Sequence, residues 1–403
     1  MKKIILFATI STLILASCHN NKPDLIEKIS VSVQLNLPAG AIIPSSYNMQ
    51  FIDLKTGHRQ EVNFGSSGAA TFNLIPGLYN AIIKAEASDE DNYTYLYSGS
   101  LVNEFILQSG KHYSIDVSIA KASPLVFKEI FYCGNASSTG VTYFHGQFYE
   151  IYNQSRGTVY VDGLCIGQFF TLLAEAVQPL WEIAGKYPGN QNDYVYGLTL
   201  HQVPGSGKEY PLEPGESIII AKWGRDHRGA SDTSLDLSSA EFEVYIPPST
   251  VQTDEPAINT NIFFISALSV PTNWLATVFG SAYAIFFPDE TVNPENFVLQ
   301  QGTSTRGLPI PLDLILDAVE CVGTAASVQL KRFPAVLDAG AIHTNGGIYV
   351  NESIARKIES IRDDGVIIFQ DTNNSTDDFE VMSPPMIRRY GVKWPSWNTW
   401  GKK

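Results

Sequence analysis

A strict alternation of apolar and polar residues near the start of the folded chain constrains its structure more than any other feature. Ile29, Val31, Val33, Leu35 and Leu37 are each separated by one polar residue. A period of two places every apolar side chain on the same face of a strand, so that one face is buried and the other meets solvent. The pattern predicts a β-sheet domain that begins close to residue 25.

Residues 68–83 carry the turn chemistry that this domain needs. Pro76 and Gly77 lie between two apolar stretches, and proline presets φ at a corner while glycine accepts the positive φ that follows. We expect a hairpin here. The spacing of Gly68, Ala70, Phe72, Leu74, Pro76-Gly77 and Tyr79 is similar to that of carboxypeptidase regulatory-like and transthyretin-like β-sandwich modules. This resemblance covers residues 25–120 and implies a spacer or interaction domain without catalytic residues.

Three tyrosines, Tyr93, Tyr95 and Tyr97, alternate along one expected strand of this domain. They could form an exposed binding stripe, but aromatic side chains usually pack in cores. We therefore expect them to pack within the sandwich.

A second domain is expected over residues 125–403, after the small and polar boundary at 120–124. Its motifs occur in the order Lys128-Glu129-Ile130, then residues 149–153 (Y-E-I-Y-N), then 159–164 (V-Y-V-D-G-L), then 212–221 (L-E-P-G-E-S-I-I-I-A). This order resembles the lamin-tail immunoglobulin-like β-sandwich. The segments Ser353-Ile354-Ala355-Arg356 and 371–379 (D-T-N-N-S-T-D-D-F) are similar to the closing segments of bacterial lamin-tail-like proteins.

An insertion of about 120 residues, at about 223–345, separates the two halves of this pattern. Within or before it, apolar runs predict strands at Leu235–Tyr245, Ile262–Val270 and Ala282–Phe287, and short helices at Phe169–Ile183 and Pro311–Val322. The predicted fold class is mainly β, with two β-sandwich domains, the second of which carries a long insertion containing short helices.

The extreme N-terminus predicts where the protein works. An apolar run after Lys2 and Lys3 ends in Leu15-Ala16-Ser17-Cys18, which is typical of a bacterial lipoprotein signal rather than a spanning helix. We expect residues 1–17 to be removed, Cys18 to be lipidated, and residues 18–24 to form a tether. Because several acyl chains hold a protein firmly, the membrane is an expected partner.

Charge and cysteine content narrow the possibilities further. The chain carries 41 acidic against 27 basic residues, a formal charge of −14, which argues against nucleic acid as a partner because phosphate binding needs clustered Lys and Arg. Cys133, Cys165 and Cys321 remain beyond Cys18. We favour a Cys133–Cys165 disulfide, because both residues lie in the same predicted sheet region, and three buried free thiols are the alternative.

One acidic segment has the spacing of a calcium loop. Asp371, Asn373, Ser375 and Asp377 occupy positions 1, 3, 5 and 7, where oxygen ligands could converge on a cation. The glycine and the bidentate glutamate of an EF-hand loop are missing. A turn in which Asp and Asn cap their own backbone is the preferred interpretation, and no metal or other cofactor is predicted.

Catalytic candidates are few. The segment 223–228 places His227 beside Asp226 and two arginines, which could orient a general base or an anionic ligand. Glu129 and Glu150 could form a glycosidase-like pair, although the lamin-tail resemblance implies that they accept hydrogen bonds from backbone or arginine donors. No nucleophile motif accompanies them, so no catalytic residue is predicted.

The C-terminal segment concentrates half of the six tryptophans. Trp394, Trp397 and Trp400 lie within seven residues and could stack on sugars or contact a partner protein. The alternative, which we favour, is that the segment docks back onto the second domain.

Together these features resemble a Bacteroidota cell-envelope lipoprotein family. The leading hypothesis is a non-catalytic binding or accessory lipoprotein of the outer membrane that serves a TonB-dependent β-barrel transporter. The competing hypothesis is a hydrolase of envelope or dietary glycans that uses Glu129, Glu150 or Asp226. The sequence does not determine the ligand, the oligomeric state, or whether the protein faces the cell surface or the periplasm.

Overall fold

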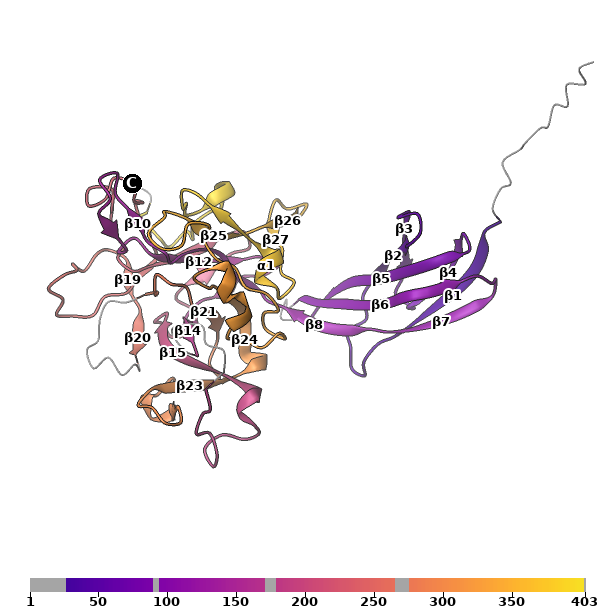
Figure 1. The fold of residues 1–403 in the computed structure, drawn as a ribbon, viewed down its shortest axis with the longest axis horizontal. Helices are drawn as coiled ribbons and strands as arrows, with labels where there is room; N and C mark the ends of the chain where they lie inside the picture. Colours follow the sequence, from indigo (N-terminus) through magenta and orange to yellow (C-terminus); the bar gives the residue numbers. More distant parts are fainter. Residues whose placement is uncertain (1–26, 90–93, 171–178, 265–274, 402–403) are drawn as a thin grey trace, which may run out of the picture. The chain divides into compact units, whose positions relative to one another are not determined.

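The computed structural model describes residues 27–89, 94–170, 179–264 and 275–401. The chain divides into two compact units, Met1–Ala87 with Tyr95–Ala120, and Lys121–Lys403 with the short segment Ser88–Thr94. Most of the regular elements in both units are strands, and the helices are short (Figure 1). The chain is therefore mainly β, as its sequence predicts.

The N-terminal unit is a two-sheet sandwich. One sheet has the strand order β4-β1-β7 and the other the order β3-β2-β5-β6-β8. The strands are β1 (Ile29–Asn36), β2 (Ser46–Asp53), β3 (Arg59–Gly65), β4 (Ala69–Leu74), β5 (Gly77–Ser88), β6 (Thr94–Ile106), β7 (Lys111–Asp116) and β8 (Ser118–Ala122). The rings of Phe51 in β2 and Phe72 in β4 meet between the sheets with their centroids 5.0 Å apart.

The alternation in β1 has the predicted effect, because Val31, Val33 and Leu35 are all buried in the core. Tyr97 is also buried, and its hydroxyl donates to the backbone oxygen of Ile42. Tyr95 packs partly against the same core, whereas Tyr93 lies outside the described residues. The two described tyrosines thus contribute to packing.

The predicted hairpin at Pro76-Gly77 is wrong in its pairing. Strands β4 and β5 flank the turn as expected, but β4 pairs with β1 and β5 pairs with β2, in opposite sheets. The Pro-Gly corner therefore carries the chain from one sheet to the other. Each strand finds its hydrogen-bond partner among residues far away in the sequence.

The C-terminal unit contains two larger sheets. The first has the order β19-β18-β17-β12-β9-β25-β28, and the second the order β22-β23-β15-β14-β21-β24 with β20 also paired to β15. The first comprises β9 (Leu125–Phe131), β12 (Phe148–Asn153), β17 (Ser217–Ala221), β18 (Phe242–Glu243), β19 (Ile258–Asn259), β25 (Ser353–Arg356) and β28 (Phe379–Met382). The second comprises β14 (Cys165–Phe169), β15 (Tyr194–Gln202), β20 (Asn261–Phe264), β21 (Ala282–Phe286), β22 (Val298–Leu299), β23 (Arg306–Pro311) and β24 (Ile315–Glu320).

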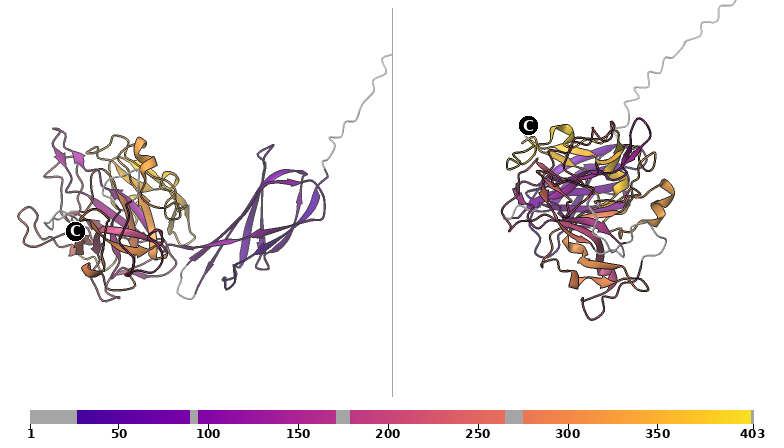
Figure 2. Two further views of the ribbon diagram at one scale, coloured as in Figure 1. Left: turned by 60° about the horizontal axis from the view of Figure 1, so that its bottom comes forward. Right: turned by 90° about the vertical axis from the view of Figure 1, so that its left-hand side faces the viewer.

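A shared core holds the two sheets together. Tyr149 from β12 and Tyr283 from β21 pack with their ring centroids 5.4 Å apart, and both side chains are completely buried. Shorter pairings lie around the sheets: β10 (Asn135–Ala136) with β11 (Thr142–Tyr143), β13 (Val159–Tyr160) with β16 (Pro211–Leu212), and β26 (Ile358–Ile361) with β27 (Ile367–Phe369). In the two views of Figure 2, loops surround the strands of this unit.

The predicted insertion at 223–345 forms part of both sheets. It supplies β18 and β19 to the first sheet and β20 to β24 to the second. Its helices are short 3₁₀ turns, η2 (Pro294–Asn296), η3 (Leu312–Leu314) and η4 (Ala325–Leu330). One sheet cannot bury its apolar face by itself, and this segment provides much of the second sheet that covers the first.

Three predicted elements in or near the insertion need correction. Pro311–Val322 is a strand, β24, preceded by one 3₁₀ turn, because its apolar run fits both periods and pairing with β21 decides the outcome. The strand expected at Leu235–Tyr245 is reduced to β18. The helix expected at Phe169–Ile183 is wrong at its start, because Phe169 is the last residue of β14. Part of the latter segment, and residues 265–270 of the strand expected at Ile262–Val270, lie outside the described residues. The strand at Ala282–Phe287 is confirmed as β21.

Candidate binding site

The C-terminal tryptophans lie on the C-terminal unit, and two of them are docked by hydrogen bonds. The indole Nε1 of Trp397 donates to the backbone oxygen of Pro211 (2.8 Å), and that of Trp400 to the backbone oxygen of Ala240 (2.8 Å). The Trp397 ring also packs against Phe242 at 5.8 Å between centroids. Trp397 and Trp400 therefore dock onto the C-terminal unit, as in the interpretation that we favoured.

Trp394, the third tryptophan, lines a cavity of about 450 Å³. The other lining residues are Glu216, Arg388, Val392, Lys393 and Ser396. The guanidinium carbon of Arg388 lies 5.1 Å from the centroid of the Trp394 ring, within the range of a cation–π contact. The cavity therefore combines an aromatic surface with groups of both charges.

Arg388 is held rigidly, yet it keeps one donor unused. Its Nη2 donates to both carboxylate oxygens of Glu241 (2.5 and 2.7 Å), and its backbone nitrogen donates to Glu150 Oε2 (3.0 Å). Among the described residues, no acceptor reaches its buried Nε. An orphaned buried donor is costly, so an oxygen atom of a ligand would stabilise this site.

Glu216 is the acidic group of the cavity. Burial raises the pKa of its carboxyl group, and a hydrogen bond from the backbone nitrogen of Glu213 (3.0 Å) opposes this shift. Together with the Ser396 hydroxyl and the indole ring, such groups suit a ligand that presents hydroxyl groups and an apolar face, as a sugar ring does.

Sequence reasoning missed Arg388 and Glu216, and also Glu241, which holds Arg388 in place. The only local signal was the Arg388-Arg389 pair a few residues before the tryptophans. Glu216 and Glu241 come from distant parts of the chain, so no spacing relates them to Trp394.

The candidate catalytic residues Glu129 and Glu150 face the C-terminal segment, and their carboxylates are engaged in structural hydrogen bonds and ion pairs. The two residues oppose each other on β9 and β12, next to a bulge in the pairing. Glu129 accepts from Arg389 Nε (3.2 Å), Ser353 Oγ (2.6 Å) and the backbone nitrogen of Met386 (2.9 Å). Both carboxylates are completely buried.

Glu150 is tied in the same way. It accepts from Lys128 Nζ (3.0 Å) and Ser217 Oγ (2.7 Å), besides the backbone of Arg388. A carboxylate enclosed by such donors is an acceptor that fastens the C-terminal segment to the sheet, as the structural interpretation of this pair predicted.

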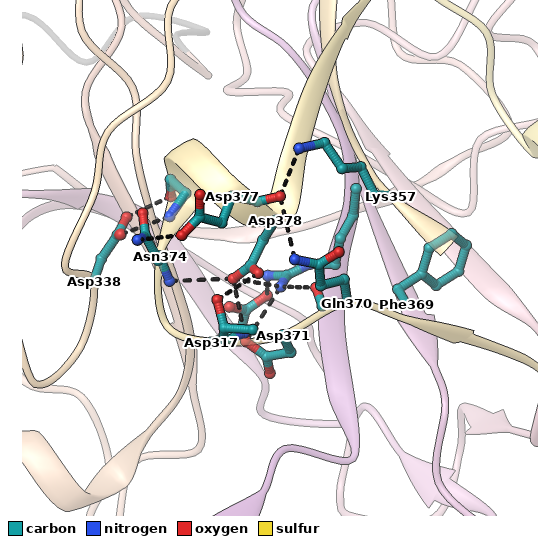
Figure 3. Close-up of polar contacts among 12 residues, drawn as sticks. Asp317, Asp338, Lys357, Phe369, Gln370, Asp371, Asn374, Asp377 and Asp378 are labelled. Carbon is teal, nitrogen blue, oxygen red and sulfur yellow. Dashed lines mark hydrogen bonds and ion pairs between the residues drawn. The ribbon is translucent and has the colours of Figure 1, made fainter. Parts of the chain in front are cut away.

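The acidic members of the calcium-like array bind different partners, and Figure 3 shows Asp371 and Asp377 lying apart. Asp371 pairs with Arg356 (3.2 Å), and the Ser375 hydroxyl donates to Asp338 instead. Asp377 accepts from Asn374 Nδ2 (2.7 Å). In the described part of the chain, no group of three or more His, Cys, Asp or Glu side chains has the geometry of a metal site.

The capped turn that we preferred is present in this segment. The Asn374 side chain accepts from the backbone nitrogen of Thr376 (3.1 Å), and Asp378 Oδ2 accepts from the backbone nitrogens of Thr372 (2.9 Å) and Asn374 (3.1 Å). The remaining member of the array, Asn373, has a positive φ of 54°, a conformation that asparagine tolerates better than most residues.

Arg356 is the centre of this region. Its completely buried guanidinium donates to Asp317 (2.6 Å) and to the backbone oxygens of Phe127 and Gln370 (both 2.9 Å). Asp378 lies 3.9 Å from its Nη1. The cluster joins β9, β24, β25 and the loop before α1 (Ser375–Asp378), so its role is structural.

The motif around His227 forms no catalytic pair with Asp226. His227 is buried, its Nδ1 shares a hydrogen bond with the Tyr143 hydroxyl (2.8 Å), and its Nε2 contacts the backbone oxygen of Trp223 (2.9 Å). Burial lowers the pKa of His227 to about 4. Asp226 is exposed and pairs with Arg228 at 2.7 Å.

The remaining predictions concern cysteines and the membrane. The favoured Cys133–Cys165 disulfide is wrong and the alternative holds, because Cys133, Cys165 and Cys321 are buried free thiols. Cys18 and the signal segment lie outside the described residues. Within the described ranges, none of the helices is long and apolar enough to cross a membrane.

Comparison with known proteins places the chain in a family. The profile of a family described as "Protein of unknown function (DUF4876)" matches residues 213–386. The crystal structure of a DUF4876 family protein from Bacteroides thetaiotaomicron shares 34% sequence identity and a TM-score of 0.64, and the match covers 92% of this chain and 99% of that one. The chain belongs to the DUF4876 family.

Other comparisons add little to this DUF4876 assignment. A Bacteroides ovatus crystal structure described as that of a candidate adhesin matches at 9% identity and a TM-score of 0.21, over 62% of this chain and 98% of that one. That similarity is too low to support an argument. The search of curated proteins finds no match. The predicted relation to a family of unknown function found in Bacteroides is confirmed by the first structure.

Proposed function

We propose that this protein is a non-catalytic, lipid-anchored binding protein of the outer membrane that holds a sugar ligand in the Trp394 cavity. The observation that carries this proposal is the orphaned Nε of Arg388 beside the Trp394 ring in a cavity of about 450 Å³. A cavity of this size suits a small ligand. The same proposal includes a carboxypeptidase regulatory-like fold for the N-terminal unit and a lamin-tail-like fold for the C-terminal unit. Both units would serve as scaffolds for the binding site.

The state of the acidic residues supports binding rather than hydrolysis. A glycosidase needs two carboxyl groups that face the scissile bond. Glu129 and Glu150 are instead buried under the C-terminal segment and engaged by arginine, lysine, serine and backbone donors. Asp226 is separated from them and is paired with Arg228.

Replacing Trp394 with alanine is expected to weaken sugar binding by about tenfold or more, because stacking and desolvation at a central aromatic residue dominate such sites. An oligosaccharide array probed with the labelled protein measures this effect. The exposed Tyr160, also changed to alanine, is the matched control. Equal binding by wild type and Trp394→Ala would contradict the site, and release of new reducing ends would contradict a non-catalytic protein.

Changing Cys18 to alanine is expected to move the protein from the membrane fraction to the soluble fraction, since the acyl chains attached there would provide the membrane affinity. Membrane fractionation followed by immunoblotting measures the shift. Changing Ser17 to alanine keeps the small residue before the cut and serves as control. Persistence of Cys18→Ala in the membrane would rule out the lipid anchor.

The proposed partner is a TonB-dependent β-barrel transporter, to which a tethered binding protein would deliver its ligand. Crosslinking of the full-length protein in its native outer membrane, followed by mass spectrometry, identifies such a partner. Recovery of a β-barrel transporter would support delivery. Recovery of the protein alone would restrict the proposal to independent binding.

A further inference from the structure

A second cluster of unusual side chains lies where β12 begins and β17 ends. The two strands are antiparallel and pair Phe148 with Ala221. The pairing continues for one more residue, because the backbone nitrogen of Lys222 donates to the backbone oxygen of Gln147 (2.9 Å). Residues 143–147 therefore lie beside residues 222–225, away from the Trp394 cavity lining.

Lys222 is the decisive residue of this cluster. Only 4% of its surface is exposed, and its ammonium nitrogen lies 3.8 Å from the centroid of the Phe144 ring. Across the described ranges, no carboxylate and no hydrogen-bond acceptor contacts this ammonium group. Burial lowers the pKa of Lys222 to about 7. A buried cation without an acceptor is costly unless a ligand supplies one.

The acidic residues of the adjacent loop are engaged elsewhere. Glu243 accepts from the backbone nitrogens of Gly224 (2.8 Å) and Glu255 (2.9 Å). Glu255 in turn accepts from the indole Nε1 of Trp223 (3.2 Å). These carboxylates order the loop around the cluster and leave the ammonium group of Lys222 uncompensated.

A second cation, Arg225, lies in the same cluster. Its guanidinium carbon is 4.6 Å from the centroid of the Trp223 ring, and its hydrogen bond goes to the backbone oxygen of Asp226 (3.4 Å). Among the described residues it has no carboxylate partner. Two cations without carboxylate partners are unexpected in a chain of net charge −14.

Aromatic rings connect the two cations. The imidazole of His145 stacks on Phe144 (4.7 Å between centroids) and meets the Trp223 ring edge-on (6.0 Å). Burial, and then the charge of Lys222, lower the pKa of His145 to about 4, so this ring is neutral at neutral pH. The cluster is thus an aromatic surface with a basic side chain at each end, Lys222 and Arg225.

We propose that Lys222, with Arg225 and the rings of Phe144 and Trp223, binds the carboxylate of a small organic anion. An anionic oxygen would give the buried ammonium its missing acceptor, and charge-assisted hydrogen bonds are the strongest available. The aromatic residues would contact the organic body of the ligand. The site is separate from the Trp394 cavity and does not depend on the function proposed there.

Isothermal titration of the full chain carrying Trp394→Ala, which removes the sugar site proposed above, tests the Lys222 site with D-glucuronate. D-glucose is the uncharged match, benzoate is a carboxylate that is not a sugar, and inorganic phosphate is a different anion. We expect glucuronate or benzoate to bind and glucose not to bind. Equal binding of glucose and glucuronate, preference for phosphate, or binding of none of the four probes would overturn the proposal.

Variants locate the binding. Lys222→Met keeps the length of the side chain and removes the charge, and it is expected to weaken carboxylate binding by about tenfold or more. Arg225→Gln, at a partly exposed position, should weaken it less. Lys208→Met, at an exposed lysine, is the control. Circular dichroism checks folding, and unchanged binding by folded Lys222→Met and Arg225→Gln would overturn the assignment.

Discussion

Replacing Arg356 with methionine is expected to destabilise the C-terminal unit by about 3–5 kcal/mol, the usual cost of leaving a buried charge without its partner. Arg356 is completely buried and lies within 2.6 Å of Asp317 and 3.2 Å of Asp371. Its loss would leave these carboxylates facing each other and would orphan the backbone oxygen of Phe127. Thermal and urea unfolding, followed by circular dichroism, measure the change.

Arg228→Met is the matched control for this substitution. Arg228 also bridges two carboxylates, Asp226 (2.7 Å) and Asp236 (3.0 Å), but its side chain is 60% exposed. Exposed ion pairs contribute about 0–1 kcal/mol. If Arg356→Met and Arg228→Met shifted the unfolding free energy equally, the buried cluster would have no special role in stability.

A double variant separates charge from packing at the Arg356 cluster. Burial raises the pKa of Asp317, although the guanidinium of Arg356 opposes this shift. Asp317→Asn removes the charge and keeps an oxygen that can accept from the backbone nitrogen of Phe127. Arg356→Met combined with Asp317→Asn should therefore be more stable than Arg356→Met alone. A double variant as unstable as the single one would indicate that lost packing, rather than uncompensated charge, causes the effect.

The sequence was sufficient for the fold class because the strands carry their own patterns. The alternation of Val31, Val33 and Leu35 depends only on which face is buried, and it predicts β1 without knowledge of its partner. The motif segments at 128–130, 149–153, 212–221 and 353–356 contribute β9, β12, β17 and β25 to one sheet, whereas the segment 159–164 contributes only β13, which pairs with β16 in a separate sheet.

Strand pairing could not be read from the same patterns. Pro76-Gly77 fits a turn within a sheet and a crossing between sheets equally well, and the choice depends on β1 and β2, which precede it by dozens of residues. The segment Pro311–Val322 had the same limitation, since a short apolar run does not distinguish helix from strand. Its pairing with β21 determines that it is extended.

The candidate site was predictable only in its most concentrated part. Three tryptophans in seven residues were visible at once, but the sequence could not tell the docked indoles of Trp397 and Trp400 from the cavity-lining ring of Trp394. That distinction depends on which backbone carbonyl each Nε1 reaches. Lys222 carried no local signal at all, because its lack of a partner is a property of the folded chain.

Replacing Glu241 with alanine is expected to release the C-terminal segment, again at a cost of about 3–5 kcal/mol. The buried carboxylate of Glu241 accepts from Arg388 Nη2, from Asn398 Nδ2 and from the backbone nitrogen of Ile219 (2.7 Å). Its removal leaves Arg388 Nη2 and the backbone nitrogen of Ile219 without this acceptor, and it leaves Asn398 Nδ2 with the backbone oxygen of Ser239 (2.9 Å). Faster tryptic cleavage after Arg388 and Lys393, together with a red shift of tryptophan fluorescence, would report the release.

Glu209→Ala is the control, because this carboxylate is exposed and, within the described ranges, its side chain accepts from the Ser206 hydroxyl (2.7 Å) and anchors no buried group. The double variant Glu241→Leu with Arg388→Leu removes both buried charges and should recover part of the stability, since apolar replacement of a buried ion pair is often tolerated. It should still fail to bind sugar, because the cavity then lacks the Arg388 guanidinium. Intact sugar binding by this variant would mean that the Arg388 guanidinium is not needed for recognition. Stable docking without sugar binding would separate the structural use of Arg388 from its use in recognition.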